Sequence, residues 1–275
     1  MKQLKYGMIP GFGTLGGLSD MRESAKELDA FIQKVLTATA TTTTTTNASS
    51  ASTQKVDIVA HSEGAAVARY YLKFLDRQTK QEQQQQQQQE QQEEEEEFLQ
   101  ERPGRVRSLV SIAPVGKGTS VLGLLAMTQI LGIYDFLADT VQQYCVACVQ
   151  ILEGSDFMQE LYGDDGLQAE VPGVRYLNVI TNRDRAVTPF TNGVMDIPEP
   201  PKFKGVNGAT KTEVEAPPLL QNLVLENHCD SNPDQSDHCG IFQSPFALHA
   251  TYAFLASDSG TIDTNIPCTF STDGA

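Results

Sequence analysis

The chain has 275 residues, of which 40% are hydrophobic, so it is long enough to bury one sizeable core. Its formal net charge of -15 argues against nucleic acid or an anionic membrane surface as a partner. No apolar run reaches the length of about 20 residues that spans a bilayer, which predicts no transmembrane segment. The first residues, MKQLKYGMIPGFG, lack the apolar stretch of a signal peptide.

Two polar low-complexity stretches interrupt the pattern. Residues 37–53 are rich in threonine, and residues 78–97 consist mainly of glutamine and glutamate. Such tracts bury too little apolar surface to offset the entropy of ordering, so both are expected to be disordered or loosely structured. The second tract could be an interaction segment or a tolerated surface insertion, and the insertion is the better interpretation.

The remaining sequence alternates between apolar runs and helical patterns. Residues 2–9 are interpreted as a possible end of a strand. Further strands are expected over 56–60, 106–114, 174–181 and 219–227. Helices are expected over 19–36, from 65 to 77 and over 244–256. This order predicts one α/β domain over residues 1–275, with a parallel sheet covered by helices on both faces. Both tracts then join a helix to the next strand, away from the carboxyl edge where ligands bind.

The stretch VDIVAHSEGAAVARYYLKFL, residues 56–75, reads as a strand, a tight turn and a helix. Ser62 lies at the turn between the small residues Ala60 and Gly64, which is the context of a nucleophile elbow. The usual spelling is G-x-S-x-G, and here alanine replaces the first glycine. Ser62 could equally be the N-cap of the following helix, because serine is a preferred capping residue.

A serine nucleophile needs a base, and the chain has four histidines. His61 adjoins Ser62 on a sharp turn and is expected to point elsewhere. His228 ends an expected strand, and His249 lies within the last helix, where a partly buried structural role is expected. His238 follows the last strand in the loop NPDQSDHCG and can reach across the sheet edge, so it is the best candidate base.

The orienting acid is expected at the end of another strand. The run RYLNVIT leads directly into NRDRAVTP, which places Asp184 at a carboxyl end. The order Ser62, Asp184, His238 is the chain order of α/β-hydrolases. Asp184 could instead be a turn aspartate ahead of Pro189, and the same holds for Asp237, but three roles at three strand ends favour the triad.

Four segments together resemble the class 2 triacylglycerol lipases, which are secreted α/β-hydrolases: VDIVAHSEGAAVARYYLKFL, VRSLVSIAPVGKGT, VRYLNVITNRDRAVTPF and SDHCGIFQSPFAL. The resemblance extends from about residue 5 to residue 268. It implies that Ser62, Asp184 and His238 are nucleophile, acid and base, that the substrate is a lipid or simpler ester, and that no metal or cofactor takes part. The chain departs from the family at Ala60, at Glu63 where glutamine is usual, and at the position after the candidate base.

The chain has five cysteines: Cys145, Cys148, Cys229, Cys239 and Cys268. The resemblance marks the segments 144–161 and 225–230 as matching cysteine-bearing segments, and an exported enzyme could form at most two bridges. Cys239 is expected to be free, because it borders the candidate base where the family has an aliphatic residue. A bond from Cys145 or Cys148 to Cys229 is the leading expectation for the others.

Acyl transfer also needs an oxyanion hole. One donor is expected to be the backbone N–H of Glu63, and the second normally follows a His-Gly pair in an earlier loop, which this chain lacks. The glycine-rich segment 10–17 is separated from the elbow strand by one helix only, so it fits a later loop. The chain is therefore expected to lack the first strands and the oxyanion loop, and the second donor is missing or unknown.

Two functions remain open at this stage. The first is a serine ester hydrolase, for which the apolar region 118–152 supplies a cap that forms an acyl-binding wall or a lid in transient contact with a lipid interface. The same region could be an ordinary pair of core helices. The second function is a lipase-like fragment that keeps the triad residues but is catalytically impaired or serves as a binding module.

Overall fold

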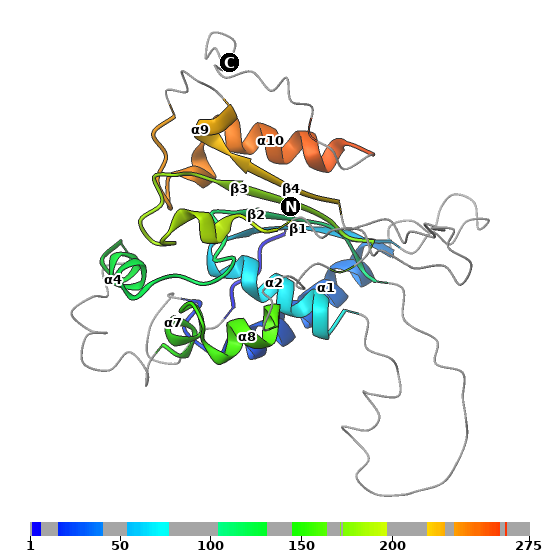
Figure 1. Cartoon of the computed structure of the whole chain (residues 1–275). Coiled ribbons are helices and arrows are strands. Elements are labelled where there is room, and N and C mark those ends of the chain that lie inside the picture. The colour runs from blue at the N-terminus through cyan, green and yellow to red at the C-terminus, as the bar shows by residue number, and fades with distance from the viewer. Residues whose placement is uncertain are drawn as a thin grey trace, which may run out of the picture.

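The computed structural model describes residues 2–6, 16–40, 54–76, 104–130, 145–163, 171, 173–196, 219–228, 234–258 and 262. Within these ranges the chain alternates between strands and helices and forms a layered α/β fold (Figure 1). The alternation is the one that the apolar runs and helical patterns of the sequence predict.

The described sheet has four strands in the order β1-β2-β3-β4, and every neighbouring pair is parallel. The strands are β1 Val56–His61, β2 Val106–Ile112, β3 Arg175–Ile180 and β4 Leu219–Val224. The prediction of a parallel sheet is therefore confirmed. Because all four strands run in one direction, their carboxyl ends meet at one edge, where His61 pairs with Ile112 and Ile180 pairs with Val224.

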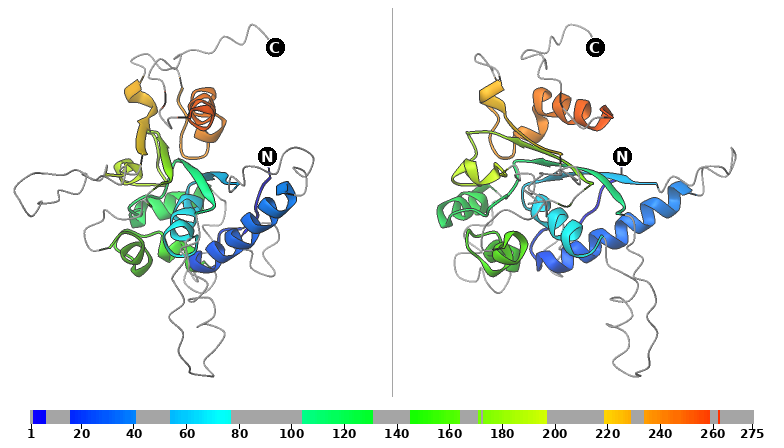
Figure 2. Two further views of the ribbon diagram at one scale, coloured as in Figure 1. Left: turned by 90° about the vertical axis from the view of Figure 1, so that its right-hand side faces the viewer. Right: turned by 45° about the vertical axis from the view of Figure 1, so that its right-hand side comes forward.

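Helices cover both faces of the sheet (Figures 1 and 2). One face carries α1 Met21–Ala40, α2 Glu63–Phe74, α7 Val146–Gln150 and α8 Asp156–Tyr162. The other face carries α9 Leu225–His228 and α10 Pro245–Ala256, with the short 3-10 turns η1 Phe190–Gly193 and η2 Ile241–Gln243 in the connecting loops. The helix α4 Val121–Ile130 lies beside the carboxyl edge.

The hydrophobic core is divided by the sheet into two clusters. Leu109 of β2 faces α2 and α8 in the larger cluster, whereas its neighbour Val110 faces α10 in the smaller one. Successive side chains of a strand point to opposite faces, so a strand between two helical layers is buried at consecutive positions. Burial accordingly extends along almost all of β2 and all of β3, and it includes polar side chains such as Ser111 and Asn178.

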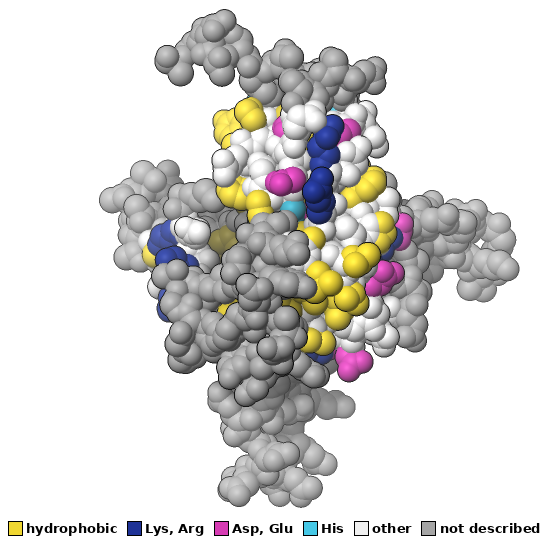
Figure 3. All heavy atoms as spheres, turned by 90° about the vertical axis from the view of Figure 1, so that its left-hand side faces the viewer, with side chains coloured by type: hydrophobic (Ala, Val, Ile, Leu, Met, Phe, Trp, Pro, Cys, Tyr) yellow, Lys and Arg dark blue, Asp and Glu magenta, His cyan; other side chains and the backbone are white. Residues whose placement is uncertain are grey.

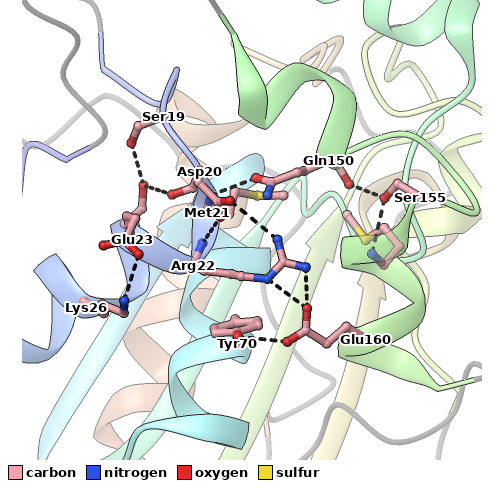
Figure 4. A network of polar contacts seen from close by, with 12 residues as sticks. Ser19, Asp20, Met21, Arg22, Glu23, Lys26, Tyr70, Gln150, Ser155 and Glu160 are labelled. Carbon is pink, nitrogen blue, oxygen red and sulfur yellow. Dashed lines mark hydrogen bonds and ion pairs between the residues drawn. The ribbon is translucent and has the colours of Figure 1, made fainter. Parts of the chain in front are cut away.

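A polar network joins the start of α1 to the helices beside it (Figure 4). The Nε–H of Arg22 donates to Oε2 of Glu160 on α8 over 2.9 Å, and the hydroxyl of Tyr70 on α2 donates to the other oxygen of Glu160 over 2.9 Å. The N–H of Met21, one of the first helical donors without an intrahelical partner, is bound by Oε1 of Gln150 at 2.8 Å. The network fixes the positions of α1, α2, α7 and α8 relative to one another.

A second polar network joins α2 to strands β2, β3 and β4 in the interior. Arg69 of α2 is fully buried and donates to Oγ of Ser111 over 3.1 Å and to Oδ1 of Asn178 over 2.7 Å. The amide of Asn178 donates to Asn222 over 2.9 Å, and the amide of Asn222 donates to the carbonyl oxygen of Met195 over 2.7 Å. Hydrogen bonds thus cross β2, β3 and β4, which ties the register of three strands to one helix.

The first low-complexity tract, residues 37–53, begins as a helix and not as the disordered or loosely structured segment that was expected. Helix α1 continues to Ala40, past the expected end at 36. The hydroxyls of Thr37 and Thr39 donate to the carbonyl oxygens of Gln33 and Val35, and such bonds allow threonine to remain helical. Residues 41–53 and the tract 78–97 lie outside the described residues.

The region 118–152 contains two described helices, α4 and α7, and residues 131–144 between them lie outside the description. The strand expected over 219–227 ends at Val224, and the chain turns directly into α9. None of the helices in the described ranges combines the length and apolar character needed to cross a bilayer.

The predicted disulfide from Cys145 or Cys148 to Cys229 is wrong. Cys145 is bonded to Cys148, with the two Cα atoms 5.2 Å apart. Cys145 caps the start of α7, and the first turn of this helix brings the N–H of Cys148 to 3.2 Å from the sulfur of Cys145. Cys239 is free, as predicted. Cys229 and Cys268 lie outside the described residues.

Replacing Asn178 by leucine should lower the free energy of unfolding by about 1–3 kcal/mol, because it leaves buried donors and acceptors of this network without a partner. Urea unfolding followed by circular dichroism measures the effect. The control is Asn182→Leu, because Asn182 is exposed just beyond the same strand. Equal effects of the two substitutions would show that the buried network contributes nothing specific.

Candidate active site

Ser62 lies where β1 turns into α2, at the carboxyl edge of the sheet. Its φ is 54° and its ψ is -125°, a left-handed conformation that is rare for any residue other than glycine. Its N–H donates to the carbonyl oxygen of Ile112 over 2.9 Å, and its own carbonyl oxygen accepts from Val115 over 3.2 Å. The hydroxyl makes no capping hydrogen bond to α2, although Ser62 stands at the N-cap position. Its hydroxyl is therefore available for another contact.

The close approach at the elbow involves Gly64 more than Ala60. A Cβ on Gly64 would lie 3.8 Å from the Cβ of Ala60 and 3.2 Å from the hydroxyl oxygen of Tyr6. The distance to Tyr6 is tight, whereas the distance to Ala60 is an ordinary van der Waals contact. Alanine at 60 therefore fits beside residue 64, and the elbow forms without the first glycine of the usual pattern.

The hydroxyl of Ser62 contacts His238, and His238 contacts Asp184. The Nε2 atom of His238 lies 2.8 Å from Oγ of Ser62, and its Nδ1 atom lies 2.8 Å from Oδ2 of Asp184. His238 is 3% exposed and Asp184 is 8% exposed, so the contact between them is shielded from water. The structure brings together the three residues that the spacing of the sequence selected, each following a different strand.

Asp184 forms a turn and contacts the histidine at the same time. Its Oδ1 atom accepts hydrogen bonds from the N–H groups of Ala186 and Val187, both over 2.8 Å, which leaves Oδ2 for the imidazole. The nearby Asp237 has a local role only, since its Oδ1 accepts from the N–H groups of Cys239 and Gly240. The two interpretations of Asp184 are therefore compatible, and the turn fixes the direction of its carboxylate.

The loop that carries His238 is anchored on both sides. Before it, the hydroxyl of Thr181 binds the carbonyl oxygen of Ser236 over 2.9 Å. Asp234 binds the N–H of Ser236 over 2.9 Å and also contacts the hydroxyl of Ser244, the N-cap of α10. The start of α10 and the end of β3 thus hold the loop at the sheet edge.

His61 is a site residue that the sequence did not reveal. Its Nε2 atom lies 2.8 Å from the main-chain oxygen of His238, so the side chain faces the triad instead of pointing elsewhere. The other two histidines lie apart from Ser62. His228 packs against Phe246, with ring centroids 5.1 Å apart, and His249 is exposed on α10 rather than partly buried.

Glu63 follows Ser62 and begins α2. Its N–H, as the first in the helix, has no intrahelical acceptor. Its Oε1 atom is buried without a hydrogen-bond partner among the described residues, and a Cβ on Gly17 would lie 3.2 Å from its Oε2. Burial raises the pKa of Glu63 to about 8, so the carboxyl is mainly protonated at neutral pH.

A second oxyanion donor is not assigned in the described residues. Most of the glycine-rich segment 10–17 lies outside them, and the N–H of Gly17 already donates to the carbonyl oxygen of Tyr6 over 3.0 Å. Within the described ranges, no three His, Cys, Asp or Glu side chains gather as metal ligands would. The hydroxyl of Ser62 and the carboxylate of Asp184 each lie within hydrogen-bonding distance of the imidazole of His238.

The side of the molecule on which α4 lies has an apolar surface (Figures 1 and 3). Three of its side chains, Val121, Leu122 and Leu125, are 62%, 76% and 39% exposed. The start of α4 is attached to the segment after Asp184, because the hydroxyl of Thr119 donates to the carbonyl oxygen of Ala186 over 2.7 Å. The apolar surface therefore adjoins the segment that carries the acid.

The family comparison identifies the chain. The model of the family described as Lipase (class 2) matches residues 46–193, which is more than half of the sequence. The chain belongs to the class 2 lipase family, and its fold is that of the α/β-hydrolases. No curated protein matches the sequence.

Two solved structures are similar to this chain. The crystal structure of Aspergillus fumigatus lipase B matches with a TM-score of 0.51 and 13% identity, over 88% of this chain and 43% of that one. This chain therefore spans less than half the length of the fungal lipase, and the similarity concerns the fold. Phospholipase PlaB from Legionella pneumophila matches with a TM-score of 0.34 and 13% identity, over 63% of this chain and 32% of that one.

Glu63→Gln should stabilise the chain at neutral pH, and its advantage should increase with pH. Unfolding returns the carboxyl to its ordinary pKa of 4.5, whereas the folded pKa is about 8. Between these values the unfolded chain binds fewer protons, so the stability of the wild type falls as pH rises, by up to roughly 1.4 kcal/mol per pH unit. The amide does not titrate and removes this dependence.

Urea unfolding of both proteins across this pH window tests the prediction. The control is Glu27→Gln, because Glu27 is exposed on α1. If Glu63→Gln follows the same pH dependence as the wild type, the carboxyl is already ionised in the folded protein.

Proposed function

We propose that the chain is a serine carboxylester hydrolase that acts on acylglycerols or simpler esters through Ser62, His238 and Asp184. The observation that carries the proposal is the continuous hydrogen-bonded path from the Ser62 hydroxyl through both nitrogens of His238 to Asp184, with both contacts at 2.8 Å. Membership of the class 2 lipase family supports ester hydrolysis as the class of reaction.

The hydrogen bonds assign the proton positions. The carboxylate of Asp184 only accepts, so Nδ1 of His238 carries the proton, and Nε2 is free to accept the proton of Ser62. As Oγ of Ser62 attacks the ester carbonyl carbon, His238 takes the hydroxyl proton and becomes an imidazolium that Asp184 stabilises. His238 then gives this proton to the departing alcohol, which leaves an acyl group on Ser62.

Water then hydrolyses the acyl-enzyme, with His238 again acting first as base and then as acid. His238 accepts a proton from water as the hydroxide attacks the acyl carbon, and then returns a proton to Oγ of Ser62 as the fatty acid leaves. The N–H of Glu63 stabilises the oxyanion in both steps, because it begins α2 and has no intrahelical acceptor. The neutral carboxyl of Glu63 adds no negative charge near this donor.

An apolar surface on α4 supports a lipid or ester as the substrate class. Val121, Leu122 and Leu125 expose apolar area on α4, where acyl chains or a lipid interface can make contact. Secretion is a further part of the proposal. The disulfide between Cys145 and Cys148 supports it, because such bonds persist mainly in oxidising compartments.

The 275-residue chain should form a covalent adduct with a fluorophosphonate probe, and Ser62→Ala should abolish it, because an activated serine attacks the phosphorus, displaces fluoride and becomes phosphonylated. Intact-mass spectrometry detects the adduct, and peptide mapping locates it. Ser19→Ala, which changes a serine ahead of α1, is the control and should label normally. An adduct on another residue would remove Ser62 from the proposal. An adduct on Ser62 without ester turnover would favour the impaired lipase-like chain.

Asp184→Asn should lower kcat by about 10⁴-fold, because an amide at this position no longer fixes the catalytic tautomer of His238 or stabilises the imidazolium. The matched control is Asp237→Asn, next to the histidine. Asp237 uses only its Oδ1 atom as an acceptor for turn N–H groups, which asparagine can also do. Similar losses of kcat in both variants would mean that a disturbed loop, and not the loss of the Asp184 carboxylate, lowers the activity.

A further inference from the structure

Two consecutive residues of the elbow contact His238. Ser62 reaches its ring, and His61 reaches its main chain, where Nε2 of His61 lies 2.8 Å from the carbonyl oxygen of His238. We propose that His61 is a positioning residue that holds the main chain of His238 so that the catalytic ring stays against Ser62. This inference rests on the proposed function, because it assigns His238 as the base.

The contact defines which nitrogen of His61 carries its proton. A carbonyl oxygen only accepts hydrogen bonds, so Nε2 of His61 must be the donor. The same contact commits Nε2 of His61 to the main chain of His238, whereas the hydroxyl of Ser62 lies against Nε2 of His238. The side chain is suited to holding the loop and not to taking the proton.

The ring of His61 is itself held in a defined orientation. Its centroid lies 5.0 Å from that of His238, with the planes tilted by 48°, and 5.4 Å from that of Phe242, in an edge-on arrangement of 66°. Phe242 belongs to η2, the turn that follows the catalytic loop. The ring of His61 therefore packs against His238 and Phe242. Its Nε2 atom also makes a directional hydrogen bond to the main chain of His238, the catalytic base.

The other anchors of the loop do not act on this residue. Thr181 binds the carbonyl oxygen of Ser236, and Asp237 closes a turn with the N–H groups of Cys239 and Gly240. The carbonyl group of His238 itself is bound by His61. Without this donor the carbonyl would lose its partner, and the main chain could shift relative to the elbow.

The site also favours a neutral His61. The titratable groups that face it are His238 and Asp184, and Phe242 is apolar. Burial is the largest effect and lowers the pKa of His61. The hydrogen bond to the main chain of His238 and the charge of Asp184 raise this pKa, the charge of His238 lowers it, and the net shift is downward. His238 must gain a positive charge during turnover, and a neutral neighbour does not oppose this. A positive charge on His61 would oppose it.

Three substitutions separate the hydrogen bond from packing. Glutamine places an amide N–H near the position of Nε2, asparagine is too short to reach it, and phenylalanine keeps the ring without a donor. Steady-state hydrolysis of p-nitrophenyl butyrate should show that His61→Phe and His61→Asn lose about 10²-fold in kcat with little change in KM. His61→Gln should retain most of kcat.

Melting curves and titration with the fluorophosphonate probe correct each rate for the folded fraction. A His61→Phe variant as active as the wild type would overturn the inference. So would a His61→Gln variant as impaired as His61→Phe, because packing would then explain the loss.

Nitrogen-15 NMR of the imidazole groups tests the same contact without turnover. The wild type should show the proton of neutral His61 on Nε2, and His61→Phe should alter the resonances of His238 more than His61→Gln does. A proton on Nδ1 of His61 would overturn the inference whether or not the chain hydrolyses esters. If the contact is present but Ser62 is neither labelled nor active, the proposed function fails instead.

Discussion

The left-handed backbone of Ser62 is the constraint on which the site depends. A residue other than glycine in this region carries a conformational cost of order 1–3 kcal/mol and persists only where its surroundings hold it. Here the parallel pairing of β1 with β2 brings the carbonyl oxygen of Ile112 and the N–H of Val115 to the main chain of Ser62. The strand pairing thus supplies the bonds that keep the hydroxyl above the sheet edge.

Burial keeps both neighbours of Ser62 close to neutral. It lowers the pKa of His61 and raises the pKa of Glu63, so each favours its uncharged form at neutral pH. A positive charge on His61, with its ring 5.0 Å from that of His238, would oppose the imidazolium by roughly 3 kcal/mol at an effective dielectric constant of about 20. An ionised Glu63 would similarly oppose the oxyanion. The elbow therefore leaves Asp184 as the charge that acts on His238.

The sequence predicted the parts of the fold that depend on residue pattern. Apolar-rich runs correctly indicated a parallel sheet between two layers of helices, because a strand covered on both faces is buried at consecutive positions. The ends of these runs also selected Ser62, Asp184 and His238, which the structure brings into contact. Their catalytic roles stay a prediction.

Other features depend on contacts that a residue pattern does not encode. The bond from His61 has a main-chain oxygen as its acceptor, and any residue at position 238 would supply one. The pairing of Cys145 with Cys148 depends on where α7 begins, and element boundaries are the least certain part of a sequence prediction. The extension of α1 depends on threonine hydroxyls that bond to the preceding turn, which composition alone does not reveal.

The two departures from the usual elbow sequence differ in their physical consequences. Alanine at 60 affects only the space at the elbow, and that space is sufficient, because even a Cβ at 64 would lie in ordinary contact with the Cβ of Ala60, 3.8 Å away. Glutamate at 63 is a question of charge, since an amide and a protonated carboxyl have similar shapes but only the acid can ionise. The raised pKa of Glu63 makes the acid resemble an amide below about pH 8 and unlike it above. The first departure leaves the elbow the same under all conditions, whereas the second makes its electrostatics depend on pH.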